Sequence, residues 1–180
     1  MASRSWLPRA ETVRIVPTRM TFAILIVCRA NLCRSPMVEA MLAHACLQAG
    51  LPWHIDSAGT ECAMPDLLPD PRIMAVLQQQ GLDSAHRSRQ ITDADFTSFS
   101  LILAADRRVM AGLEALRPAA NPGSATARLE YLGDYDDEGE REIADPAFAV
   151  GNLAFRALHH HVHRCVTGLI KAHATHVRRG

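Results

Sequence analysis

Short apolar runs alternate with amphipathic segments along this chain, which is the pattern of strands and helices that follow one another. The run at residues 22–27 is short and rich in branched side chains, and this predicts a buried strand. Residues 37–47 instead repeat their apolar positions at helical spacing. The same reasoning predicts strands at 53–56, 101–105 and 128–132, a turn at 92–96 capped by Thr92, a loop at 117–126, and helices ending at Leu116 and His173.

Residues that start and stop helices fit this pattern. Gly50 ends the first helix, and the next helix has Asp70 at its cap, Pro71 in its first turn and Gly81 at its end. The last helix, 152–173, buries one apolar stripe, formed by Leu158, Val162, Cys165, Val166, Leu169 and Ile170. Strands that alternate with helices predict an α/β fold: a three-layer sandwich with a four-stranded parallel sheet, helices on both faces, and ligands at the carboxyl ends of the strands.

Composition narrows the class of protein. A chain of 180 residues with 48% hydrophobic content predicts one domain, placed at residues 20–175, with residues 1–19 as a disordered extension. A formal net charge of +0 gives no overall field that would attract nucleic acid, and we expect no membrane insertion. The five cysteines lack the spacing of a disulfide framework, which indicates a reducing compartment, the cytoplasm.

The loop between the first strand and the first helix carries the candidate chemistry. Cys28 and Arg34 are separated by five residues, Ser35 can cap the helix, and Pro36 fits its first turn. Backbone N–H groups and the positive end of the helix dipole would converge there on one oxyanion. These donors favour thiolate over thiol, so Cys28 is the predicted nucleophile and Arg34 the predicted phosphate ligand.

The stretch Cys28–Pro36 resembles the Cys-x-Gly-Asn-x-Cys-Arg-Ser-Pro motif of the low-molecular-weight protein tyrosine phosphatases. The resemblance extends from about residue 21 to the last helix and includes residues 57–60, 69–72 and 86–90. It implies hydrolysis of phosphotyrosine in a protein through a cysteinyl-phosphate, with no cofactor and no metal. In bacterial relatives the partner is often a tyrosine kinase of polysaccharide export. It also implies a set of substrate-binding residues in the loop: Arg29, Ala30, Asn31, Leu32, Cys33 and Ser35.

The resemblance assigns further roles outside the loop. Asp145, in the pair Asp145-Pro146, matches the family's general acid, which protonates the leaving oxygen. Ser57 and His86 match residues that hydrogen-bond around Asn31 and hold the loop rigid. In the family, cysteines at the positions of Cys28 and Cys33 can close a protective disulfide.

The sequence departs from the family motif at three places. Ala30 replaces a loop glycine, and if that position needs a positive φ the alanine costs about 1 kcal/mol. Ala147, followed by Phe148, stands where an aromatic residue usually follows Asp-Pro, and Ala63 and Met64 stand where another aromatic lines the pocket. We therefore expect activity on phosphotyrosine with reduced selectivity for it.

Alternative functions of such a site differ in the residues that they require. A phosphoarginine phosphatase usually has Thr at the position of Leu32, and an arsenate reductase needs a cysteine pair near residues 104–112, which is lacking. A phosphatase of small aryl phosphates and a non-catalytic phosphoprotein-binding module stay open, although a binding module would lose Cys28 or Asp145.

Two patterns imitate metal sites. Asp134, Asp136, Glu138 and Asp145 approximate the spacing of a calcium loop, but their order and setting favour a solvated acidic loop. The histidines at 159–161 and 163 include a pair four residues apart, and they are expected to form a polar helix face.

Overall fold

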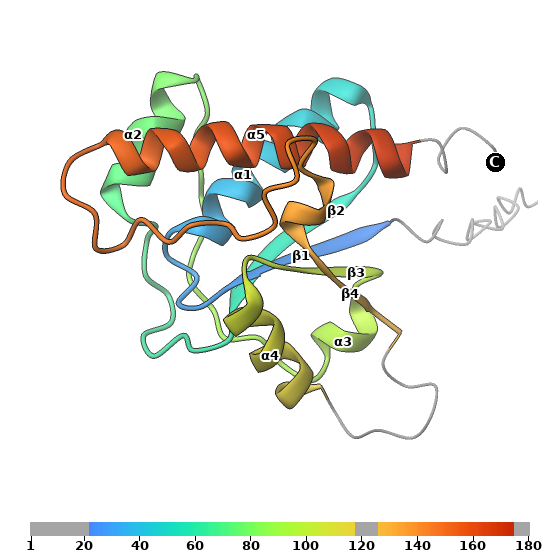
Figure 1. The fold of residues 1–180 in the computed structure, drawn as a ribbon. Helices are drawn as coiled ribbons and strands as arrows, with labels where there is room; N and C mark the ends of the chain where they lie inside the picture. The colour runs from blue at the N-terminus through green and yellow to red at the C-terminus, as the bar shows by residue number, and fades with distance from the viewer. Residues whose placement is uncertain (1–21, 118–125, 175–180) are drawn as a thin grey trace, which may run out of the picture.

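The computed structural model describes residues 22–117 and 126–174, so the predicted extension 1–19 and most of the predicted loop 117–126 lie outside the described residues. Four strands form one parallel sheet in the order β2-β1-β3-β4. Their bounds are Ala23–Cys28 for β1, His54–Gly59 for β2, Leu101–Ala104 for β3 and Arg128–Tyr131 for β4. The predicted α/β fold with a four-stranded parallel sheet is confirmed (Figure 1).

Helices cover both faces of the sheet, as predicted (Figure 1). One face packs against three helices: α1 (Arg34–Ala49), α2 (Pro71–Gln79) and α5 (Leu153–His173). The other face packs against α3 (Asp95–Ser98) and α4 (Arg107–Leu116). A short 3-10 helix, η1 (Leu132–Tyr135), follows β4. No helix among the described residues is apolar over a length that would cross a bilayer.

The central strand β1 explains why the sheet has two cores. All six of its residues are buried, because side chains that alternate along the strand enter opposite layers. Ile24 and Ile26 join the core under α1 and α5, whereas Leu25 and Val27 join the core under α4. A near-continuous apolar run is what a parallel strand covered on both faces requires.

The ends of several elements differ from the predicted ones. Strand β2 continues to Gly59, three residues further than predicted, since Ser57 and Ala58 pair with β1. Asp70 caps α2 as predicted, and its carboxylate accepts a hydrogen bond from the Arg72 N–H. Ser35 is not an N-cap: α1 already begins at Arg34, and the hydroxyl of Ser35 has another partner.

Candidate active site

The candidate site lies where the strand order of the sheet reverses. Strand β2 follows β1 in the chain and lies on one side of it, whereas β3 lies on the other side of β1. In a parallel sheet this leaves a crevice at the carboxyl ends of the two neighbouring strands. Cys28 ends β1, and Asp106 follows β3 as the N-cap of α4, so both residues reach this crevice.

The loop after Cys28 turns its carbonyl groups outward. The carbonyl oxygens of Cys28, Arg29 and Leu32 accept hydrogen bonds from the backbone N–H groups of Thr60, Glu61 and Asp70, at 2.8–3.0 Å. In a planar trans peptide the next N–H points opposite to the carbonyl, so the N–H groups of the following residues turn toward the enclosed space. The loop therefore forms an anion cradle that is supported from outside and completed by the first turn of α1.

Asn31 fixes the shape of this loop. It is fully buried and has a left-handed backbone, with φ of 58°. Its side-chain amide donates to the hydroxyls of Ser35 (2.9 Å) and Ser57 (2.8 Å), and its side-chain oxygen accepts from the Arg89 N–H (2.8 Å). Asn31 and Asp66 are the described non-glycine residues with positive φ, so the strain expected at Ala30 does not arise there.

Ser57 and His86 lie beside Asn31, where the sequence places them, and a carboxylate joins them. Nε2 of His86 contacts the Asn31 carbonyl oxygen at 3.1 Å, and its Nδ1 lies 2.9 Å from Glu39. The Ser57 hydroxyl donates to Glu39 at 2.6 Å. Sequence reasoning missed Glu39, because one glutamate on the first helix carries no sign that it faces a histidine 47 residues away.

Gly59 is a second residue that the sequence did not single out. A Cβ at this position would lie 2.7 Å from the Arg29 carbonyl oxygen, too close for any side chain. Gly59 ends β2 directly beside Cys28 in the sheet. The loop can therefore rest on β2 only because residue 59 lacks a side chain.

The predicted nucleophile lies at the base of the cradle. Cys28 is buried, with 3% of its surface exposed, and the Ser35 hydroxyl donates to its Sγ at 3.0 Å. Since the same hydroxyl accepts from Asn31, its proton is directed toward sulfur. A hydrogen bond of this kind stabilises a negatively charged sulfur.

Arg34 lies between two carboxylates at the side of the cradle. Its guanidinium donates to Asp106 and, at 2.9 Å, to Asp145; it also donates to the Ile143 carbonyl oxygen at 3.1 Å. Burial opposes its charge, but the hydrogen bond that Arg34 donates to Asp106 and the neighbouring Cys28 and Asp145 raise the pKa of Arg34 above its usual value. The guanidinium is thus held charged and in one orientation.

Asp106 is a partner of Arg34 that sequence reasoning did not single out. One of its carboxylate oxygens caps α4 by accepting from the Val109 N–H at 2.7 Å, and the other accepts from Arg34. Burial opposes its charge, yet the hydrogen bond from Arg34 lowers the pKa of Asp106 below its usual value. The cap motif gave no sign of this second role.

Asp145 is the most open of the three predicted catalytic residues, with 40% of its side chain exposed. One carboxylate oxygen contacts Arg34 and the other accepts from the Ala147 N–H at 3.1 Å. Cys28, Arg34 and Asp145 line one pocket of about 380 Å³. Its other lining residues are Arg29, Ala30, Leu32, Cys33, Glu61, Ala63, Met64, Asp70, Arg72, Ala147 and Phe148.

Comparison with known proteins matches this architecture. The family model described as "Low molecular weight phosphotyrosine protein phosphatase" matches residues 23–179. The chain belongs to this family.

Relatives and solved structures agree with the match. The low molecular weight phosphotyrosine protein phosphatase of Sus scrofa is 31% identical over 155 residues, covering 85% of this chain and 96% of that protein. Phosphatase 2 of Drosophila melanogaster is 36% identical over 140 residues, covering 76% and 83%. The crystal structure of DARP, a Drosophila arginine phosphatase, has a TM-score of 0.78 and 32% identity, covering 83% of this chain and 96% of that one. Members of the low molecular weight phosphotyrosine phosphatase family are phosphomonoester hydrolases that dephosphorylate phosphoproteins.

In this member of the family, Cys33 lies at the edge of the pocket beside Asp70. Its thiol donates to the Asp70 carboxylate at a sulfur–oxygen distance of 3.7 Å. Burial, with the negative charge of Asp70 next, raises the pKa of the Cys33 thiol to about 12. Cys33 is therefore a protonated thiol at neutral pH.

The acidic stretch around the end of η1 is largely solvated, as the sequence predicts, since Asp134, Glu138 and Glu140 are exposed, but Asp136 departs from that prediction. Asp136 is buried, and Arg164 donates to it at 2.6 and 3.2 Å and to Glu140 at 3.2 Å. The Arg164 hydrogen bond lowers the pKa of Asp136 to about 2. Ligand atoms of Asp136, Glu140 and His161 lie within 4.8 Å of one another, and a guanidinium supplies the positive charge among them.

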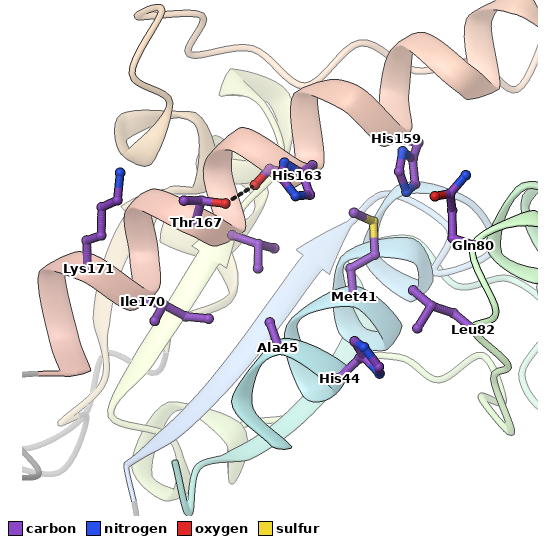
Figure 2. Close-up of a pocket in the computed structure, with 11 residues that line it drawn as sticks. Met41, His44, Ala45, Gln80, Leu82, His159, His163, Thr167, Ile170 and Lys171 are labelled. Carbon is purple, nitrogen blue, oxygen red and sulfur yellow. Dashed lines mark hydrogen bonds between the residues drawn. The ribbon is translucent and has the colours of Figure 1, made fainter. Parts of the chain in front are cut away.

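The histidines of α5 divide between two settings. His161 is buried and its Nε2 lies 2.8 Å from the Glu140 carbonyl oxygen, so the predicted polar face does not include it. His159 and His163 line a cavity of about 400 Å³ between α1 and α5, together with His44 of α1 (Figure 2). Burial, and then the charges of His160 and His163, lower the pKa of His159.

Proposed function

We propose that this protein hydrolyses phosphotyrosine in proteins through a cysteinyl-phosphate intermediate. The observation that supports this most directly is the meeting of Cys28, Arg34 and Asp145 in one pocket, beside a loop in which several carbonyl groups accept hydrogen bonds from outside. These are a nucleophile, a charged phosphate ligand and a carboxyl group that can move a proton. The protein partner is a phosphotyrosine protein, with a bacterial tyrosine kinase as one such partner.

In the first step the Cys28 thiolate attacks phosphorus. Arg34 and the loop N–H groups bind the equatorial oxygens of the phosphoryl group, where negative charge must be stabilised. Asp145 protonates the leaving oxygen, which is otherwise a poor leaving group. Its open position at the pocket mouth agrees with contact to the leaving side of the substrate.

In the second step water attacks the cysteinyl-phosphate, with Asp145 now acting as the base. Sulfur leaves as a thiolate, and the hydrogen bond from Ser35 eases this departure. Asn31, Ser57, His86 and Glu39 position the loop in both steps without touching the reacting atoms.

Phosphoarginine is the second candidate substrate. The similarity to DARP, an arginine phosphatase, favours it. Leu32, where such enzymes usually have Thr, opposes it, and so do the apolar walls at Ala63, Met64 and Phe148. These apolar side chains can contact a phenyl ring. The partners that the pocket offers a guanidinium are the carboxylates of Glu61, Asp70 and Asp145, and each of them already pairs with an arginine of this chain.

Kinetics on matched peptides will separate the two substrates. We expect the kcat/KM for a phosphotyrosine peptide to exceed that for the corresponding phosphoserine and phosphoarginine peptides by about tenfold or more, which corresponds to about 1.4 kcal/mol. A higher kcat/KM for phosphoarginine would replace the proposed substrate. If the protein hydrolyses none of the three peptides but binds phosphate tightly, it is a binding module.

Peroxide should inactivate the enzyme reversibly if Cys33 protects Cys28. A sulfenic acid formed at Cys28 condenses with a neighbouring thiol, and a thiol reductant then restores the active form. In Cys33→Ser the same peroxide dose should cause lasting loss of activity. Activity recovered after reduction is the measurement, and full recovery of the variant would mean that Cys33 serves only the structure.

A further inference from the structure

Exposed apolar side chains are concentrated in two segments, each of which also contributes residues to the lining of the phosphate pocket. Among the described residues, eight large hydrophobic side chains are exposed, and two of these, Leu47 on α1 and Leu116 on α4, lie apart in the sequence from the rest. The other six form what we call the apolar rim: Met64, Leu67, Leu68, Phe148, Val150 and Leu153. Phe148 is 92% exposed and Val150 is 99% exposed. Monomeric proteins rarely leave such a set uncovered unless it binds something.

The two segments that carry the apolar rim are also almost free of charge. In residues 63–69 and 146–153 together, Asp66 is the single charged residue, although 21% of the whole chain is charged. Neither segment contains a lysine or an arginine. A solvated loop usually has the opposite composition, so this surface is suited to apolar contacts.

The first segment is rigid because the buried Ser88 holds it. The Ser88 hydroxyl donates to the Met64 carbonyl oxygen and accepts from the Leu67 N–H, both at 3.0 Å. The Ser88 backbone adds two more bonds, to the Leu67 carbonyl oxygen (2.9 Å) and from the Asp66 N–H (2.7 Å). Asp66 is held with a positive φ of 66° in this turn. The backbone that presents Leu67 and Leu68 is thus fixed before any partner binds.

The second segment is tied to the first through Arg72. Its guanidinium donates to the carbonyl oxygens of Ala147 and Ala149, both at 3.2 Å, and lies over the Phe155 ring at 4.4 Å. The same guanidinium pairs with Asp70, which directly follows the first segment. Met64 and Phe148 both line the phosphate pocket. The apolar rim is therefore continuous with that pocket on two sides and preorganised.

We propose that the apolar rim binds apolar side chains that flank the phosphorylated residue of a protein substrate. This inference rests on the proposed function, since it requires a phosphorylated side chain in the pocket. An extended peptide advances about 3.3 Å per residue, so the neighbours up to three positions away remain within about 10 Å of the pocket mouth. A membrane surface fits less well, because peripheral membrane segments combine apolar groups with lysine and arginine.

Peptide kinetics test the proposal. Two phosphotyrosine peptides of equal length and charge are compared, one with leucine and one with serine at the two positions on each side of the phosphotyrosine. Burying about 50 Å² of apolar surface corresponds to about an eightfold change, so we expect kcat/KM to favour the leucine peptide by about fivefold to tenfold or more. Equal kcat/KM values on both peptides would overturn the proposal.

Substitutions locate the preference on the surface. In Leu68→Ser and Val150→Ser, two residues outside the pocket lining, the ratio of kcat/KM between the two peptides should fall toward one. Leu47→Ser is the matched control, since Leu47 is 76% exposed on α1 and should leave the ratio unchanged. A ratio that falls equally in the control, or in none of the variants, would contradict the assignment.

Three further measurements separate this proposal from the proposed function and exclude other occupants of the apolar rim. Hydrolysis of p-nitrophenyl phosphate by the wild-type protein tests the chemistry alone: if it proceeds while the peptides are not distinguished, the apolar rim fails and the phosphatase stands. Sedimentation on phosphatidylcholine–phosphatidylserine vesicles and self-association in the ultracentrifuge should both be negative. Vesicle binding that Leu68→Ser abolishes would assign the apolar rim to a membrane, and self-association that Leu68→Ser abolishes would assign it to a second copy of the chain.

Discussion

Replacing Cys28 with serine will reduce phosphatase turnover by more than about a hundredfold while phosphate still binds. A serine hydroxyl at this position lacks the ionised sulfur that attacks phosphorus. Arg34 and the loop N–H groups are unchanged, so the phosphate affinity should stay within a few-fold of wild type. Steady-state kinetics and calorimetric titration with inorganic phosphate measure the two effects separately.

A matched control for this variant is Cys46→Ser, which changes another buried thiol of the same core region. It should retain turnover when measured at a temperature where the protein is folded. Residual turnover of Cys28→Ser above about a hundredth of wild type would contradict covalent catalysis through Cys28.

Asp145→Asn will lower turnover in a way that depends on the leaving group. Asparagine is nearly the same size, and its single side-chain oxygen can accept from Arg34 in place of the carboxylate oxygen that does so now, with loss of the bond from the Ala147 N–H. It cannot donate a carboxylic acid proton. For phenyl phosphate, which has a poor leaving group, we expect a loss of about a hundredfold or more.

For an activated aryl phosphate such as p-nitrophenyl phosphate, the same variant should lose much less in the first step, since the leaving oxygen needs no proton. Comparing kcat/KM across a series of aryl phosphates therefore gives a steeper dependence on leaving-group pKa in the variant than in wild type. Equal losses on all substrates would remove Asp145 from the role of general acid.

Much of the fold could be predicted because local patterns and tertiary structure agree. The buried run before Cys28 had to be a strand covered on both faces, and the Asp70-Pro71 pair marked a helix start that the structure keeps. The Cys28 loop could be recognised since its residues are consecutive. A motif of consecutive residues is visible in the sequence itself. Asp145 lies far from this motif, and it could be assigned to the site only through the resemblance to a family.

What could not be predicted depends on contacts between distant segments. Asp106 has the local role of a helix cap, and its contact with Arg34 spans 72 residues. Glu39 and Gly59 are ordinary residues until the loop packs beside them. Ser35 has the sequence of an N-cap, but the Cys28 sulfur and Asn31 use its hydroxyl instead. The sequence around Asp136 is typical of a solvated loop, but in the structure Arg164 of α5 pairs with Asp136.

The position of Asn31 has a consequence for the order in which the protein folds. Its hydrogen bonds reach Ser57, His86 and the Arg89 N–H, at sequence separations of 26, 55 and 58 residues. Contacts that close such long loops form late, because the chain entropy they cost must first be offset by the core. The short strand–loop–helix segment that contains the motif therefore cannot shape the cradle by itself. Phosphate affinity is a property of the assembled domain, and phosphate will in turn stabilise that assembled state.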